Sequence, residues 1–253
     1  MNEGRFIELR DTDVNTFQCL QEVFPESAVS APILLLEEPR EQISIGQKAI
    51  VDKAVHLDFC EANDIPIVRS PFPHSSSMYC CGQALKGLLA IALESPLMTD
   101  VEVGKKLVIE SLIASLDNLS LTASFLPRSN NITVGEKKIL PIISRIHQNV
   151  LLFGFTLLLD FNYDRAEKVL ISKKDMRENL TTIRKELGRD VTFDEVKNAL
   201  KQGFRSVLAI EFLDDELTKE EIRKAEEARE KYLSETWVKY GRWSSVKEYE
   251  RPE

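Results

Sequence analysis

The sequence lacks the features that mark a membrane-inserted or secreted protein. No stretch approaches eighteen uninterrupted apolar residues, and the first residues, MNEGRFIELRD, carry charge at once instead of an apolar signal region. We therefore expect a cytoplasmic protein with no membrane partner.

Residues that bind metal ions or form disulfides are few and unfavourably spaced. The four cysteines have no CxxC spacing, and the three histidines lie far apart along the chain. Neither a zinc site nor a disulfide framework can be derived from these spacings, and free thiols in a reducing compartment are expected.

The chain also lacks an excess of positive charge. Its formal net charge is −8 with an isoelectric point near 5.2, and the lysines and arginines alternate with acids. Because no basic stripe is present for a phosphate backbone to follow, we expect no nucleic-acid partner.

Enough apolar sequence is present to close a sizeable core. With 253 residues, 43% of them hydrophobic, the chain is expected to form one domain over residues 1–253, with a helical portion from about residue 162. Thr192 and Thr218 each stand three residues before a glutamate, the spacing of a capping box, and so predict two helix starts in that portion.

The pattern of apolar residues predicts several further elements. These are a hairpin between Pro32 and Ile45, a helix after Gly46 that leads into a strand at 65–68, a long amphipathic helix over 101–119, and strands at 132–134 and 150–160. The last run, VLLFGFTLLLD, is almost continuously apolar, which is typical of a central strand buried on both faces.

Three separated segments resemble the lipoate-protein ligase catalytic domain of the biotin/lipoate ligase family. The first is ISIGQKAIVDKAVHLDFCEANDIPIVR, and the second is RSNNITVGEKKI. The third is LLLDFNYDRAEKVL, followed by VTFDEVKNALKQGF and ETWVKYGRW. Together they span most of the chain from Pro32 to Gly241, in the order that the family has.

The resemblance implies an α/β (α+β) fold with a central mixed β-sheet flanked by helices. It also implies an acyl-adenylate made from ATP, with Mg²⁺, and lipoate or octanoate, and then transfer of the acyl group to a lysine of a lipoyl carrier domain. That carrier would belong to a 2-oxoacid dehydrogenase or a glycine cleavage system. No accessory domain is expected after ETWVKYGRW, so the resemblance implies a separate small accessory subunit.

Lys138 matches the catalytic lysine of the family. A fixed ammonium suits this chemistry, because both the adenylation step and the transfer step build negative charge. Lys137 is its neighbour, and in a strand the two side chains point to opposite faces, so only one can enter a pocket. The alternative is a pair of surface lysines after a turn.

Asn130 and Asn131 stand where the family has an asparagine followed by an aspartate. The match makes both candidate ligand- or nucleotide-binding residues. Asn131 in place of the acid removes a charge that a hard cation prefers, so we predict no protein metal site and place the magnesium step in doubt. Alone, two adjacent asparagines more often mark a turn.

The segment VRSPFPHSSSMYCCG replaces the family's two arginines and three glycines. Of that set only Arg69 remains, and we expect it on the phosphate. Two prolines each lack an amide donor, so the loop cannot present the same row of N–H groups. His74, Ser75, Ser76 and Ser77 are candidate replacements for ligand contacts, and a plain surface loop is an equal alternative.

Cys80 and Cys81 could act as acyl-accepting nucleophiles only if a neighbour activated them, and buried structural thiols are the better interpretation.

The sequence leaves two functions open. One is ATP-dependent attachment of lipoate or octanoate to a carrier lysine. The other is a non-catalytic paralogue that binds a lipoyl domain or an acyl ligand and acts as a regulator or assembly partner.

Overall fold

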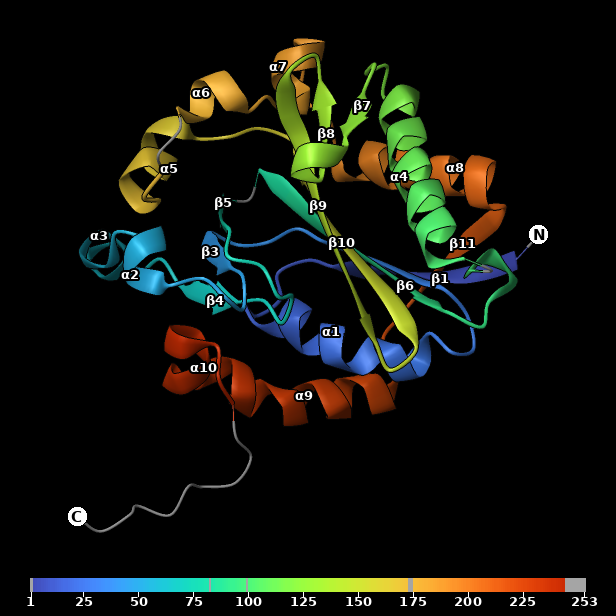
Figure 1. Cartoon of the computed structure of the whole chain (residues 1–253), viewed down its shortest axis with the longest axis horizontal. Helices are drawn as coiled ribbons and strands as arrows, with labels where there is room; N and C mark the ends of the chain where they lie inside the picture. Colours follow the sequence, from blue (N-terminus) through green and yellow to red (C-terminus); the bar gives the residue numbers. More distant parts are fainter. Residues whose placement is uncertain (1, 82, 99, 173–174, 244–253) are drawn as a thin grey trace.

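A large mixed β-sheet forms the centre of the molecule (Figure 1). The computed structural model describes residues 2–81, 83–98, 100–172 and 175–243. In spatial order the strands of the large sheet are β11 (Ile210–Asp215), β1 (Asn2–Leu9), β2 (Ile33–Glu37), β6 (Ala84–Ala92), β10 (Val150–Leu158), β9 (Lys137–His147), β8 (Asn131–Val134) and β7 (Ser124–Leu126). The pairs β11–β1 and β1–β2 are parallel, and the remaining neighbours are antiparallel.

The middle strands are those with the longest apolar runs. Every residue of β2 and β6 is buried, as are all but one of β10. A strand buried on both faces needs no polar alternation, and this sheet is covered by helices on both sides. The predicted central strand at 150–160 is therefore confirmed.

A second, three-stranded sheet stands beside the first. It has the order β4 (Ile67–Arg69), β3 (Gln42–Ile45) and β5 (Ser77–Cys80), and α2 (Val51–Ala54) and α3 (Leu57–Ala62) connect β3 to β4. The predicted hairpin between Pro32 and Ile45 is wrong, because β2 joins the large sheet and β3 the small one. The fully buried β2 pairs instead with β1 and β6.

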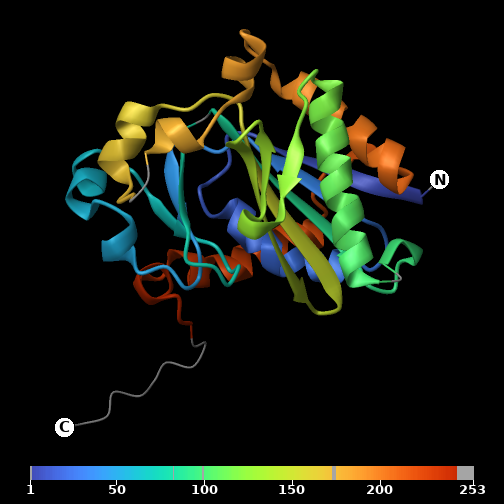
Figure 2. The ribbon, with the colours of Figure 1, turned by 45° about the horizontal axis from the view of Figure 1, so that its top comes forward.

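Helices cover the two faces of the large sheet differently (Figures 1 and 2). On one face, α4 (Val101–Asn118) packs against α8 (Phe193–Leu208), and on the other, α1 (Thr16–Ser27) packs against α9 (Lys219–Leu233). The remaining helices are α5 (Tyr163–Val169), α6 (Met176–Asn179), α7 (Ile183–Leu187) and α10 (Glu235–Tyr240), with short 3-10 turns at Pro96–Met98 and Pro127–Ser129.

The predicted helix starts are confirmed. Thr192 and Thr218 each form a complete capping box at the start of α8 and α9. Although α9 is rich in charged residues, its Tyr232 is fully buried and donates to Glu22 of α1 at 2.7 Å. No helix in the described ranges is both long and apolar enough to cross a membrane.

Candidate ligand site

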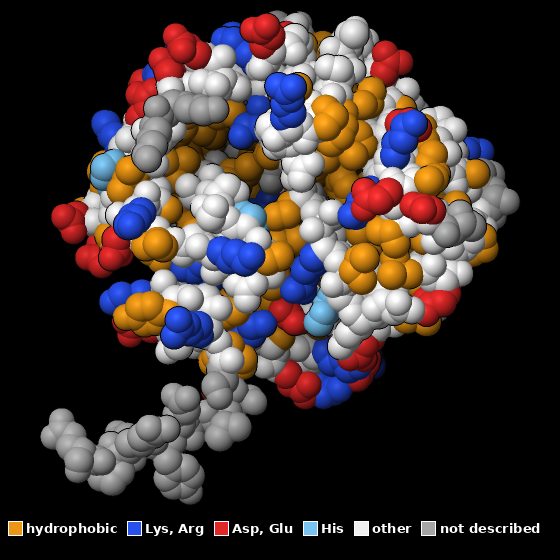
Figure 3. All heavy atoms as spheres, viewed as in Figure 1, with side chains coloured by type: hydrophobic (Ala, Val, Ile, Leu, Met, Phe, Trp, Pro, Cys, Tyr) orange, Lys and Arg blue, Asp and Glu red, His pale blue; other side chains and the backbone are white. Residues whose placement is uncertain are grey.

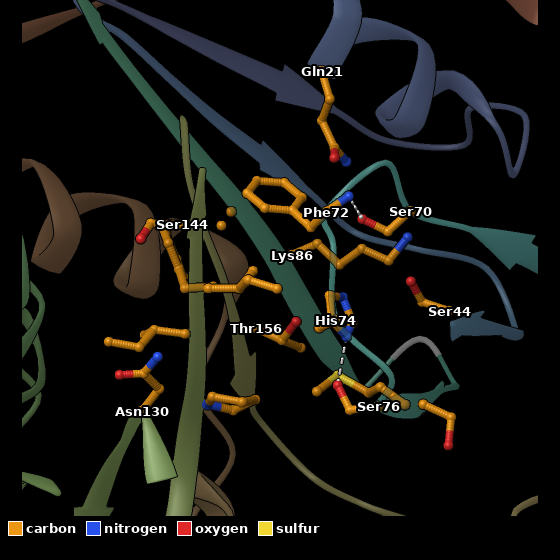
Figure 4. A pocket seen from close by; sticks show the side chains of 18 of the residues that line it. Gln21, Ser44, Ser70, Phe72, His74, Ser76, Lys86, Asn130, Ser144 and Thr156 are labelled. Carbon is orange, nitrogen blue, oxygen red and sulfur yellow. Dashed lines mark hydrogen bonds between the residues drawn. The ribbon is translucent and has the colours of Figure 1, made fainter. Parts of the chain in front are cut away.

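A cavity of about 440 Å³ opens where the large sheet faces α1 and the small sheet. Its floor includes Lys86 of β6, Thr156 of β10 and Pro141 of β9, which lie in one row across neighbouring strands. Its roof is formed by α1, by the loop between β4 and β5, and by β5 itself (Figure 4). The space-filling view shows this face of the molecule hollowed near its middle (Figure 3).

A second cavity of about 290 Å³ adjoins the first. The two share Ser77, Met78 and Pro141 as lining residues. The smaller cavity also contains Lys138, and α6 with the chain leading into it forms its outer wall. A ligand can therefore extend from Lys138 past Pro141 into the larger cavity.

The structure distinguishes the two adjacent lysines as the strand geometry requires. Lys138 lines the smaller cavity, whereas the Lys137 ammonium donates to the carbonyl of Arg177 at 2.8 Å. The Lys138 carbonyl accepts from the amide of Thr181 at 2.9 Å, which holds this part of β9 against the segment before α7. Of the pair, Lys138 is thus the one that can meet a ligand.

Arg69 lies outside both cavities. Its side chain is fully buried at the end of β4, and its guanidinium donates to five carbonyls at 2.7–3.2 Å. Those carbonyls belong to Gly46, Gln47, Ala49, Val238 and Lys239. The indole of Trp237 in turn donates to the Arg69 carbonyl at 3.2 Å. The structure therefore gives Arg69 a structural role, the attachment of α10 to the small sheet, and leaves it no donor aimed at a phosphate.

The loop between β4 and β5 has few amides to offer an anion. Pro71 and Pro73 have none, the Phe72 amide donates to the Ser70 hydroxyl at 3.2 Å, and the His74 amide donates to the Phe72 carbonyl at 2.8 Å. Every position from 71 to 74 is thus without an available N–H group. Gly82, the last residue of the rewritten segment, lies outside the described residues.

His74 and Ser76 do reach the larger cavity. A hydrogen bond of 2.7 Å joins the Ser76 hydroxyl to Nδ1 of His74, as Figure 4 shows. Burial lowers the pKa of the His74 imidazole below its usual range, so the ring is neutral at pH 7. The pair offers neutral polar contacts and no fixed positive charge.

The other candidate residues are divided between cavity and surface. Ser77 lines both cavities, and Asn130, in a left-handed backbone conformation, lines the larger one. Ser75 is exposed, and neither it nor Asn131 lines either cavity. The predicted set is therefore brought together only in part, as His74, Ser76, Ser77 and Asn130 around one cavity, with Lys138 in the next.

The described residues form no ready-made cage of ligands for a metal ion. Asp175 lines the smaller cavity, but its carboxylate caps α6 by accepting from the amide of Arg177 at 2.7 Å. Asn131, which replaces the family's acid, does not reach either cavity. Among the described residues, no group of three or more His, Cys, Asp or Glu side chains is placed to hold a metal ion.

Four cavity or near-cavity residues escaped the sequence analysis. Gln18 and Gln21 come from α1, and Lys86 from β6 forms ion-pair and hydrogen-bond contacts of 2.9 Å with Glu37 and 3.1 Å with Gln42. Lys86 and Glu37 interrupt otherwise apolar strands and face each other across β2 and β6. A buried charge in an apolar run was the available signal, because such charges are rarely buried unless paired.

Cys80 lines the larger cavity but is not activated. It is completely buried, and burial raises the pKa of its thiol to about 11. Burial also raises the pKa of the Cys81 thiol above its usual range. Both thiols are protonated at neutral pH, which agrees with structural cysteines and not with nucleophiles.

The fold matches that of known lipoyl ligases. Residues 85–205 match the family model of the lipoyl protein ligase A/B catalytic domain. A structure from the archaeal lipoylation system of Thermoplasma acidophilum, which comprises a bi-partite lipoate protein ligase and its E2 lipoyl domain, superposes with a TM-score of 0.85 at 25% identity. That match covers 97% of this chain and 100% of the other. The chain is therefore similar to the lipoyl protein ligases in both sequence and fold.

Two further similar proteins are also lipoate-protein ligases. The lipoate-protein ligase A subunit 1 of Thermoplasma acidophilum is 25% identical over 219 residues, or 81% of this chain and 84% of that protein. A lipoate-protein ligase A solved with bound ATP has a TM-score of 0.84 at 25% identity, covering 94% of this chain and 99% of the other. The predicted central mixed sheet flanked by helices is thus confirmed as the lipoate ligase fold.

Proposed function

We propose that this protein is an acyl-binding, lipoate-protein ligase-like subunit that docks a lipoyl carrier domain and forms the acyl adenylate weakly or not at all. The observation that carries the proposal is the contrast between the two halves of the site. The acyl half has a cavity of about 440 Å³ next to Lys138, whereas positions 71–74 present no available amide.

The bound acid would be lipoate or octanoate, with its carboxylate beside Lys138 and its chain running past Pro141 into the larger cavity. A fixed ammonium stabilises a carboxylate directly and needs no other group for that role. His74, Ser76, Ser77 and Asn130 would contact the ligand along the walls.

The phosphate half lacks charge as well as amides. Arg69 is bonded to five backbone carbonyls, and Asn131 stands outside both cavities. Each charge-assisted hydrogen bond is worth on the order of 1.5–3 kcal/mol, and every 1.4 kcal/mol is about tenfold in affinity. The absence of several such bonds would weaken nucleotide binding by orders of magnitude.

A second candidate function is the full ligase reaction, ATP-dependent attachment of lipoate or octanoate to a carrier lysine. The position of Lys138 in the smaller cavity favours it, as does the likeness to a ligase solved with bound ATP. In that case Ser76 and Ser77 hydroxyls would have to replace the missing phosphate contacts.

The partners follow from the relatives. One of them is a ligase subunit, and another belongs to a lipoylation system made of a bi-partite ligase and its E2 lipoyl domain. A lipoyl domain of a 2-oxoacid dehydrogenase or glycine cleavage system is the proposed carrier, and a small accessory subunit is the proposed second component.

The test measures binding and chemistry separately. Calorimetric titration of lipoate and octanoate, with wild type and Lys138→Ala, reports the acyl site, and we expect micromolar-range binding that the variant weakens at least tenfold. Incubation with ATP, magnesium, either acid, an apo carrier domain and a small ligase subunit then reports transfer by the mass of the carrier. We expect no acyl mass at an ordinary enzymatic rate, and its appearance in wild type but not in Lys138→Ala would establish the second candidate instead.

A further inference from the structure

Two glutamine side chains of α1 are buried against the larger cavity with their amide oxygens unpaired. Gln18 and Gln21 are 1% and 2% exposed, and both line the cavity. In the part of the chain that the structure describes, the Oε1 atom of each has no hydrogen-bond partner. Gln21 extends from α1 toward Phe72 and Lys86 (Figure 4). Buried amides are nearly always hydrogen-bonded, so this pair is suited to a ligand that supplies the missing bonds.

The surroundings of these amides are polar without an excess of charge. Lys86 is 4% exposed, and its ammonium lies 2.9 Å from a carboxylate oxygen of Glu37 and 3.1 Å from Oε1 of Gln42. Because Glu37 neutralises Lys86, this end of the cavity has no free positive charge to offer a second carboxylate. A neutral hydrogen-bonding group fits it better than an anion does.

The amides lie at the end of the cavity away from Lys138. The wall shared with the Lys138 cavity is made of Ser77, Met78 and Pro141, and α1 contributes to the larger cavity alone. Pro141 on β9 and Lys86 on β6 are separated by β10, so they stand two strand spacings apart, about 10 Å. The chain of a medium-chain acid that runs from the shared wall along this direction therefore points toward the α1 end of the larger cavity.

We propose that the cavity selects a medium-chain carboxylic acid whose far end carries an uncharged hydrogen-bonding group, such as a hydroxyl or a primary amide. The inference rests on the proposed acyl site and specifies its substrate class. An acid with an apolar end, such as octanoate, leaves the amides of Gln18 and Gln21 unpaired. An acid with a polar end pairs them and gains affinity.

Four acids with the same number of carbons test this selectivity by calorimetry on the full chain. They are octanoate, 8-hydroxyoctanoate, the monoamide of octanedioic acid, and octanedioate. We expect the hydroxy acid and the monoamide to bind at least tenfold more tightly than octanoate, which corresponds to about 1.4 kcal/mol. Octanedioate should bind more weakly than the monoamide, because its second charge loses water without gaining a free cation.

Variants of Gln18 and Gln21 test whether these two side chains cause the preference for acids with a polar end. Gln18→Met, Gln21→Met and the double variant replace each amide by an apolar side chain of similar length, so they should bind octanoate as well as or better than wild type and lose the preference for the polar acids. Gln202→Met changes an exposed glutamine of α8 in the same way and should leave all affinities unchanged. Retained octanoate binding by the double variant also shows that it is folded.

The outcomes separate this inference from the function on which it rests. If octanoate binds wild type as tightly as the hydroxy acid, or if the double variant keeps the preference, the terminal-group selectivity is wrong while the acyl site stands. If none of the acids binds, the acyl site itself is wrong and both proposals fall.

Discussion

Replacement of Arg69 by methionine distinguishes a structural arginine from a phosphate-binding one. Arg69→Met keeps most of the apolar stem but removes the donors that hold five carbonyls of the β3–α2 connection and α10. Each buried carbonyl left without a hydrogen bond costs about 1–3 kcal/mol, so the loss of the donors to several of them costs at least about 3 kcal/mol. We expect a loss of that size in the free energy of unfolding.

The assay is urea unfolding followed by fluorescence. With a denaturant slope near 3 kcal/mol per molar, the expected loss lowers the urea midpoint by at least about 1 M. Arg189→Met is the matched control, since Arg189 is exposed and pairs with Glu195 on the surface, and a change of at most about 1 kcal/mol is expected there.

The affinity of Arg69→Met for octanoate tests the alternative, that Arg69 binds the ligand. If the structural role is correct, Arg69→Met measured at a temperature where it is folded should bind octanoate within about twofold of wild type, because Arg69 lines neither cavity. An unchanged unfolding free energy together with an octanoate affinity loss of tenfold or more would refute the structural role and indicate that Arg69 contributes to ligand binding.

Three further predictions concern the acid limb of stability, helix packing and thiol reactivity. Burial opposes the ionisation of Glu221, but hydrogen bonds from Arg5 overcome it and hold the pKa of Glu221 at about 2, below the usual 4.5. The stability from this carboxylate is therefore present above pH 4.5 and is lost as the pH falls through about 2. The difference in urea midpoint between wild type and Glu221→Gln should shrink over that window, and a difference independent of pH would contradict this. A Cβ at Gly203 would lie 2.1 Å from the Ser115 hydroxyl where α8 meets α4, so Gly203→Ala should lower the free energy of unfolding by about 1–3 kcal/mol, and an unchanged urea midpoint would disprove this packing. Cys80, with its pKa near 11, should resist iodoacetamide at pH 8 in the native protein and react after unfolding, as followed by peptide mass; rapid native labelling would show an activated thiol.

Much of the fold could be predicted because its signals are local. The periodic apolar positions of 101–119 became α4, and the continuous run at 150–160 became the central strand β10. The two capping boxes marked the starts of α8 and α9, since a hydroxyl and a carboxylate three residues apart satisfy the same turn wherever it lies. Lys138 was found by its motif, and strand alternation separated it from Lys137.

The candidate site could be predicted only in part, because its walls come from distant segments. The helix α1 attracted no attention in the sequence, yet it brings Gln18 and Gln21 to the cavity. The charged pair of Lys86 and Glu37 exists only because β2 and β6 are neighbours in the large sheet. Neither contact has a signature within any short stretch of sequence.

The sequence by itself determined which segments become buried strands and amphipathic helices. Its resemblance to lipoate-protein ligases also predicted a ligand loop without the family's glycines and a catalytic role for Lys138. The tertiary structure decided what the remaining charged side chains do. Arg69 has the same side chain in either role, but α10, about 170 residues later in the chain, presents carbonyls at 2.9 and 3.2 Å that occupy its guanidinium. A buried guanidinium must be satisfied by whatever acceptors packing places around it, so its role follows from the fold and not from its position in a motif.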